Sequence, residues 1–153
     1  MEVTTESRHG VRVSSLLSAI LVALSFHACA GTTVSQTVQP QVELSLESDP
    51  SGRSDESPTV TTASQDRVVL TGVMATPNPC YTIEASIEAK GQDVTLTLTA
   101  RSEPRMCVQM LGSFTYNATI TGLAAGTYGT RLIYQYPNTG WESKEFSLRL
   151  VVP

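Results

Sequence analysis

The sequence predicts an all-β protein: an antiparallel sandwich of about six or seven strands in residues 66–153, preceded by a leader and a linker. From Asp66 onward, apolar and polar residues alternate with a period of two, which is typical of strands with one buried face. Turn signals at glycines and in the Pro137–Gly140 segment recur between these stretches, and no helical period follows the leader. Short strands at this spacing favour a sandwich.

The composition indicates one small domain and excludes a nucleic-acid partner. The chain has 153 residues, of which 16% are charged, and its formal net charge is −4. Single domains commonly run to about 100–200 residues, so one core is expected. Binding to phosphates requires clustered Lys and Arg, whereas the ten basic residues of this chain are scattered singly.

Residues 1–28 have the order of a secretory signal peptide. Arg8 and Arg12 precede an apolar run over residues 13–26, and the small residues of Ala28–Gly31 follow at once, interrupted only by Cys29. The run is shorter than the roughly 20 residues that a membrane-spanning helix needs. We therefore expect an exported protein whose leader is removed.

Two kinds of cleavage are compatible with the end of this leader. Ala28-Cys29, closing an apolar run, resembles the lipobox of bacterial lipoproteins, which implies that Cys29 carries lipid and becomes the new N-terminus. Alternatively, Ala28-Cys29-Ala30 is a plain A-x-A site, and the protein is secreted without lipid from Gly31. We favour lipid attachment at Cys29, with a localisation in the cell envelope, periplasmic or exposed at the surface.

The cysteine count supports this choice. The chain has three cysteines, and an exported protein with an odd number leaves one thiol to explain. If Cys29 carries lipid, Cys80 and Cys107 remain as one disulfide, as expected in an oxidising compartment. Pairing Ala89 with Asp93 across a turn brings Cys80 to within a few residues of Cys107.

Residues 29–65 have the composition of a tether. They are rich in Ser, Thr, Gln and Pro and contain no aromatic residue, so they offer little to bury. Alternation over Gln41–Leu46 is compatible with a short strand. Asp55 and Glu56 lack the ligand spacing of a calcium loop, so we expect them to belong to a solvated linker.

The alternation continues through the rest of the chain. Two stretches separated by Lys90-Gly91-Gln92 form the clearest predicted hairpin. The expected strands, in order, are Val68–Met74, Tyr81–Ala89, Val94–Ala100, Phe114–Ile120, Tyr128–Tyr136 and Phe146–Val152.

One segment refines the fold class. Gly122–Tyr128 (GLAAGTY) resembles the corner before the sixth strand of immunoglobulin-like and fibronectin-type domains. The resemblance implies an immunoglobulin-like sandwich over residues 66–153, in which the hydroxyl of Tyr128 returns to the upstream backbone.

The sequence predicts no enzyme. His9 and His27 both lie in the leader, so the mature chain has no histidine for a Ser-His or Cys-His pair. No phosphate-binding glycine loop is present. We expect no catalytic residue, no metal site and no cofactor.

The candidate binding loop is the predicted hairpin tip that contains Tyr136, Asn138 and Trp141, the only tryptophan. Aromatic residues at an exposed tip suit a binding site. The alternative is that Trp141 folds back over the sandwich, and we favour this partial burial.

Two functions remain open. The chain resembles bacterial envelope lipoproteins that carry one immunoglobulin-like domain on a Ser/Thr-rich stalk. This resemblance implies a monomeric structural or adhesive module that is held at the membrane by its lipid and binds an unknown protein or glycan. It also resembles chagasin-type cysteine-protease inhibitors, which bind papain-like enzymes through three loops. That resemblance rests on Asn78-Pro79 and Trp141.

Overall fold

The computed structural model describes residues 39–48, 55–64 and 67–153. Within these ranges the chain forms eight strands and no helix, so none is long and apolar enough to cross a membrane. The predicted signal peptide, residue 65 and the tether stretches 29–38 and 49–54 lie outside the described residues. The strands are β1 (Gln41–Ser48), β2 (Thr59–Ser64), β3 (Arg67–Thr76), β4 (Tyr81–Lys90), β5 (Asp93–Ser102), β6 (Gly112–Thr121), β7 (Gly126–Gln135) and β8 (Lys144–Val152).

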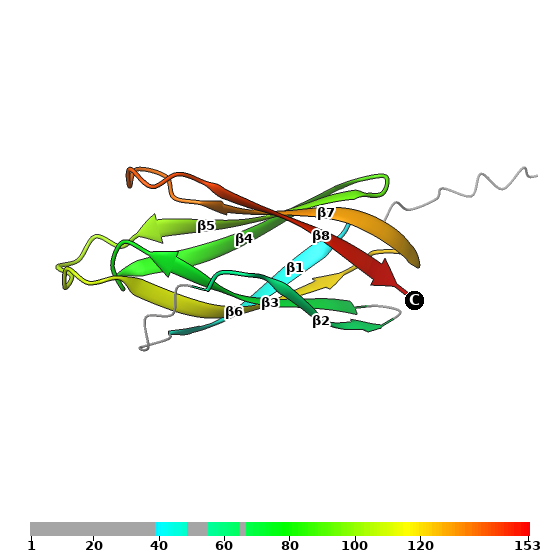
Figure 1. The fold of residues 1–153 in the computed structure, drawn as a ribbon, viewed down its shortest axis with the longest axis horizontal. Helices are drawn as coiled ribbons and strands as arrows, with labels where there is room; N and C mark the ends of the chain where they lie inside the picture. Colours follow the sequence, from blue (N-terminus) through cyan, green and yellow to red (C-terminus); the bar gives the residue numbers. More distant parts are fainter. Residues whose placement is uncertain (1–38, 49–54, 65–66) are drawn as a thin grey trace, which may run out of the picture. The chain divides into compact units, whose positions relative to one another are not determined.

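The strands form two four-stranded sheets that face each other (Figure 1). The first sheet has the order β1-β6-β3-β2, and the second has the order β4-β5-β7-β8. The alternation in the sequence places one side of each sheet in a common core, and the other side meets solvent. The predicted all-β sandwich is confirmed.

The second sheet is mixed, although we expected antiparallel strands throughout. β5 and β7 pair in parallel, whereas every other neighbouring pair in the two sheets is antiparallel. The reason is the path of the chain. After β5 it crosses to the first sheet as β6 and then returns as β7, so it re-enters the second sheet in the direction of β5.

The sandwich begins earlier than the expected boundary at residue 66. β1 pairs with β6, and β2 pairs with β3, so both edge strands of the first sheet lie in the predicted tether. Val42 and Leu44 of β1 and Val60 of β2 pack against the core. β1 alternates Val and Leu with polar residues, and β2 is rich in Thr, so both have the polar composition of a linker, which explains the error. The β-branched Thr residues of β2 nevertheless suit a strand.

The hairpin of β4 and β5 differs from the predicted register by one residue. Lys90 pairs with Asp93, and Ala89 pairs with Val94. The turn therefore has two central residues. Gly91 has a φ of 63°, as the first position of a type II′ turn requires.

The predicted corner at Tyr128 is present. The Tyr128 hydroxyl donates a hydrogen bond to the carbonyl oxygen of Ala124, at 2.9 Å. Gly122, with a φ of 82°, allows the chain to turn before β7.

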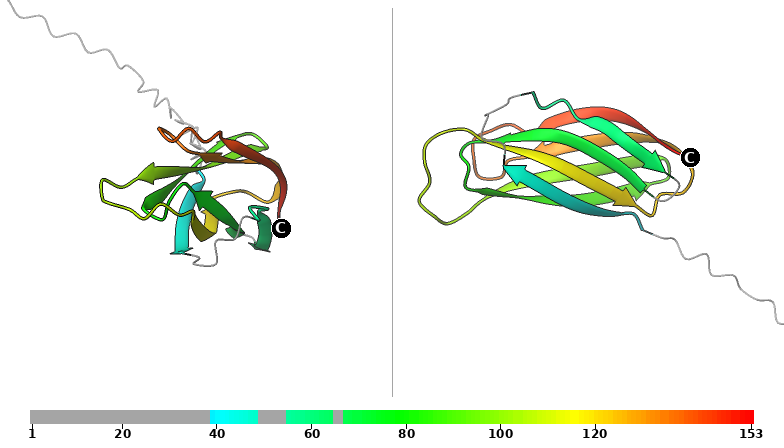
Figure 2. Two further views of the ribbon diagram at one scale, coloured as in Figure 1. Left: turned by 60° about the vertical axis from the view of Figure 1, so that its left-hand side comes forward. Right: turned by 90° about the horizontal axis from the view of Figure 1, so that it is seen from below.

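The sandwich has two distinct ends. At the first, which we call the loop end, lie the three connections that the structure describes in full at this end: residues 77–80, 103–111 and 136–143. At the opposite end, which we call the entry end, the chain enters at Gln41 and finishes near Pro153. In Figures 1 and 2 the loop end lies away from the labelled C-terminus.

Candidate functional site

The main surface feature of the loop end is the connection between β5 and β6, residues 103–111, which we call the apolar loop. Met106 is 100% exposed, and Val108, Met110 and Leu111 are 60%, 59% and 60% exposed. Among the described residues, the only other large apolar side chains that are exposed are those of Leu46 and Val151. Single exposed apolar residues are ordinary, whereas four on one short loop make this loop the candidate interaction surface.

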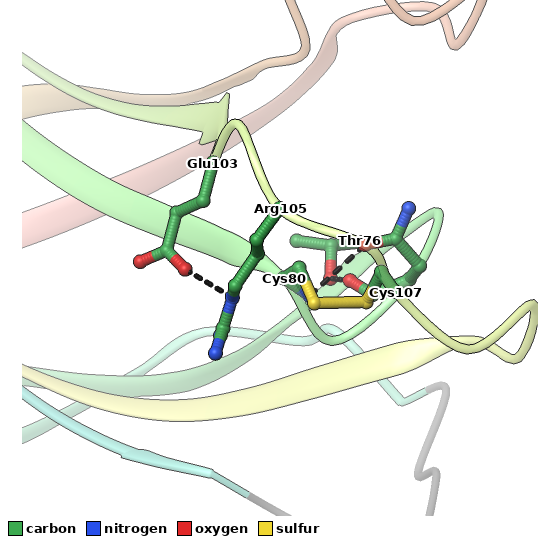
Figure 3. Close-up of a disulfide and its surroundings, with 6 residues drawn as sticks. Thr76, Cys80, Glu103, Arg105 and Cys107 are labelled. Carbon is green, nitrogen blue, oxygen red and sulfur yellow. Dashed lines mark hydrogen bonds and ion pairs between the residues drawn. A yellow bond between two sulfur atoms is a disulfide. The ribbon is translucent and has the colours of Figure 1, made fainter.

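A disulfide fixes the middle of this loop. Cys107 is bonded to Cys80 at the start of β4, with their Cα atoms 6.0 Å apart, which confirms the predicted pair (Figure 3). The amide of Glu103 donates to the carbonyl oxygen of Cys80 at 3.0 Å, so the loop also begins beside this cysteine. Glu103 and Arg105 form an ion pair within the loop, with 2.6 Å between Oε2 and Nε.

The connection at residues 77–80 packs against the end of the apolar loop. Asn78 accepts a hydrogen bond from the Cys80 amide at 2.9 Å, and its carbonyl oxygen accepts one from the Thr76 hydroxyl at 2.7 Å. Gly112, where the apolar loop enters β6, packs on this turn so closely that a Cβ there would overlap Thr76 and Asn78. Both ends of the apolar loop are therefore held by packed backbone.

The third connection corrects the predicted binding loop. Tyr136 is buried, so it cannot contact a partner. Trp141 is partly buried and packs against the core, as we favoured, with its ring 5.3 Å from that of Tyr136. Of the three predicted residues only Asn138, at the tip with a φ of 62°, is exposed.

A buried carboxylate connects this end of the two sheets. Glu56, which precedes β2, is only 8% exposed, although we expected it in a solvated linker. Its Oε1 accepts hydrogen bonds from the Ala75 amide at 3.0 Å and from the Tyr136 hydroxyl at 3.4 Å. Its Oε2 forms an ion pair with Lys144 at the start of β8. These contacts compensate for burying the charge.

Burial and this carboxylate determine how the neighbouring tyrosines ionise. Burial raises the pKa of Tyr116 to about 12, and the charge of Glu56 adds to the increase. Burial is also the main cause of the raised pKa of Tyr134 and of Tyr136, to which Glu56 again contributes. All three phenols therefore stay neutral hydrogen-bonding groups at physiological pH.

Apart from the apolar loop, the described surface shows few exposed large apolar side chains. A hollow of about 560 Å³ lies at the entry-end half of the second sheet, where Gly129, Leu148 and charged side chains such as Arg131 line it. In the described ranges, no group of three or more His, Cys, Asp or Glu side chains is arranged to hold a metal. Cys29, the predicted lipid site, lies outside the described residues.

The sequence contained a signal for the apolar loop that we did not use. Residues 106–111 (MCVQML) are apolar at all positions but one and do not alternate, and Pro104 precedes them. The run lacks the alternation of the half-buried strands around it, but a short apolar run is also typical of a fully buried strand, so its exposure is known only from the structure. The buried position of Glu56 had no comparable signal, because its partners are far away in the sequence.

Comparison with known proteins identifies a family for this chain. A family model, described as the ORF11 beta-sandwich domain, matches residues 70–148. The match begins within β3, ends within β8 and includes the whole apolar loop, whereas β1 and β2 lie outside it. No curated protein and no solved structure matches the chain.

Proposed function

Because the chain belongs to the ORF11 beta-sandwich domain family, we propose that it is an exported, lipid-anchored binding module. On a β-sandwich, function depends on the sites at the surface of the fold. In this proposal Cys29 carries the lipid and the apolar loop contacts the partner. The observation that carries the proposal is the exposure of four large apolar side chains on one disulfide-fixed loop.

The position of this loop suits a protein that is anchored by its N-terminus. The chain enters the sandwich at Gln41, at the end opposite the apolar loop. A strand of ten residues separates the two ends by about 33 Å. Twelve residues lead from Cys29 to Gln41, and they can span at most about 40 Å. A lipid at Cys29 would therefore attach the sandwich by its entry end, opposite the apolar loop.

Phase partitioning in detergent tests the anchor. We expect the wild-type protein from the cell envelope to enter the detergent phase, because a lipidated N-terminus is apolar. Cys29→Ser should appear in the aqueous phase or remain unprocessed, whereas the nearby Thr33→Ser should behave like the wild type. If the wild-type protein stays in the aqueous phase, the lipid anchor is wrong and the plain secreted form is correct.

A second candidate function, inhibition of a cysteine protease, is favoured by the arrangement of three connections at one end. Asn78 lies on the first of these and Trp141 on the third, the two positions on which the resemblance to chagasin-type inhibitors rests. Titration of papain with the purified chain tests this candidate. It requires inhibition that Trp141→Ala weakens and that Val151→Ser, at the entry end, leaves unchanged.

A further inference from the structure

We propose that the partner of the apolar loop is the same loop of a second copy of this chain, so that two sandwiches meet end to end. This inference rests on the proposed function as a binding module and names its partner. The contact would be isologous, because the same patch serves on both copies.

The charges of the loop favour a copy of the chain over a charged partner. Glu103 and Arg105 are its only acidic and basic residues, and they pair with each other. The loop is therefore neutral and offers neither an acidic nor a basic surface to select a partner of opposite charge. An anionic membrane would require clustered basic residues. A second copy requires only apolar side chains, and the cores of homodimer interfaces are more apolar than other interfaces.

The apolar loop is also constrained before any contact forms. The disulfide at Cys107 holds the chain between Met106 and Val108, and Gly112 is packed at the end of the loop. Less ordering is then needed on association than for a free loop. Two of the four exposed apolar residues are methionines, whose flexible side chains fit an imperfectly matched surface.

The size of the patch predicts a weak dimer. Stable interfaces involve about 20–30 residues on each side, and a loop of nine residues provides far fewer. We expect a Kd on the order of 0.1–1 mM in solution. Many copies held on one surface would bind more strongly to copies on another, because linked contacts raise the effective concentration.

The geometry of the contact follows from the position of the two ends. If the loop ends meet, the two entry ends point outwards, with each sandwich contributing a strand length of about 33 Å. The two Gln41 residues would then lie at least about 65 Å apart, because the two loops also lie between them. This arrangement suits copies anchored to two facing surfaces, which is homophilic adhesion.

Sedimentation equilibrium of the chain from Gly31, which contains all eight strands, tests the association. We expect the wild type to form dimers as its concentration approaches the millimolar range. Met106→Ser with Met110→Ser should weaken the dimer at least tenfold, and Val151→Ser, an exposed apolar residue at the entry end, should not. A wild type that stays monomeric, or a Val151→Ser variant that is weakened equally, would overturn the proposal.

Two further measurements separate this dimer from other arrangements. A spin label at residue 41 should give a distance of roughly 65 Å or more between copies. A distance below about 30 Å, as in side-by-side pairing, would contradict end-to-end contact. Flotation with phosphatidylethanolamine and phosphatidylglycerol vesicles should not recover the unlipidated chain, and flotation that depends on Met106 would assign the loop to lipid instead. Detergent partitioning of the wild type is independent of all these results, so failure of the anchor and failure of the dimer are distinguishable.

Discussion

The hydroxyl oxygens of Tyr116 and Tyr134 lie 2.8 Å apart in the interior, one from each sheet. The hydroxyl of Tyr134 also lies 3.2 Å from the carbonyl oxygen of Val73, so this polar pair is hydrogen-bonded back to β3. Both rings are fully buried and meet edge to face, with their centroids 6.1 Å apart. The two sheets are thus joined through a hydrogen bond as well as through apolar packing.

Gly72→Ala should destabilise the sandwich, because Gly72 provides the space for Tyr116. The two residues face each other on β3 and β6, and a Cβ at position 72 would overlap the Tyr116 hydroxyl and lie 2.7 Å from Cζ. Overpacking of this kind costs about 1–3 kcal/mol. Gly129→Ala, where the nearest side-chain atom is an ordinary 3.5 Å away, is the matched control. Equal urea denaturation midpoints for the two variants would contradict this assignment.

The buried tyrosines predict a loss of stability in alkaline solution. The pKa of Tyr116 is raised from 10.0 to about 12, and those of Tyr134 and Tyr136 are raised as well. Their stabilising contribution is complete below pH 10, where the unfolded phenols are protonated. It decreases above pH 10, by up to about 1.4 kcal/mol per pH unit for each tyrosine, because only the unfolded state then releases the proton readily.

Denaturant titrations between pH 8 and pH 12, followed together with tyrosinate absorbance, check this expectation. Part of the tyrosinate signal should appear only with unfolding. Ionisation of all five tyrosines near pH 10 in a protein that remains folded would show that the raised pKa values are wrong.

Reduction of Cys80–Cys107 should lower the melting temperature by roughly 10 °C or more. The bond joins residues 27 apart, and the loss of its constraint on the unfolded chain costs about 3.5 kcal/mol in the chain-entropy model. The double variant Cys80→Ala with Cys107→Ala should melt at the lowered temperature with and without reductant. A wild type whose melting curve does not respond to reductant, although its thiols are free, would refute the expectation.

Glu56→Ala should cost about 2–3 kcal/mol, because it removes charged hydrogen bonds to Ala75 and Tyr136 together with the ion pair to Lys144. Glu56→Gln, which retains the hydrogen-bonding shape without the charge, should lie between the wild type and the alanine variant. The exposed Glu142 is the control, and its replacement by alanine should stay within about 0.5 kcal/mol. If Glu56→Ala and Glu142→Ala had the same melting temperature in thermal unfolding, Glu56 would be an ordinary surface residue.

The parts of the fold that the sequence predicted are those with local signals. Alternation over Tyr81–Lys90 directly reports which side of a strand is buried, and Tyr128 follows a recognisable corner. The disulfide followed from the cysteine count and from a hairpin whose register was wrong by one residue. That error was small enough to leave the pairing of the cysteines correct.

The parts that were missed depend on contacts between distant residues. Glu56 has the sequence context of a linker, and only its contacts with β3 and β8 make it a buried group. The parallel pairing of β5 with β7 depends on the path of the chain through the other sheet, which alternation does not encode. Tyr136 lies only two residues before Asn138, so the sequence predicts it at the exposed tip, whereas its ring is buried.

Mass spectrometry of the mature N-terminus, on protein purified from the producing cell's envelope, tests the central claim most directly. The account predicts a chain that begins at Cys29 and whose first residue carries the added mass of lipid. A mature protein that begins at Gly31 with no lipid would contradict the anchor, and the sandwich with its apolar loop would then belong to a freely secreted protein.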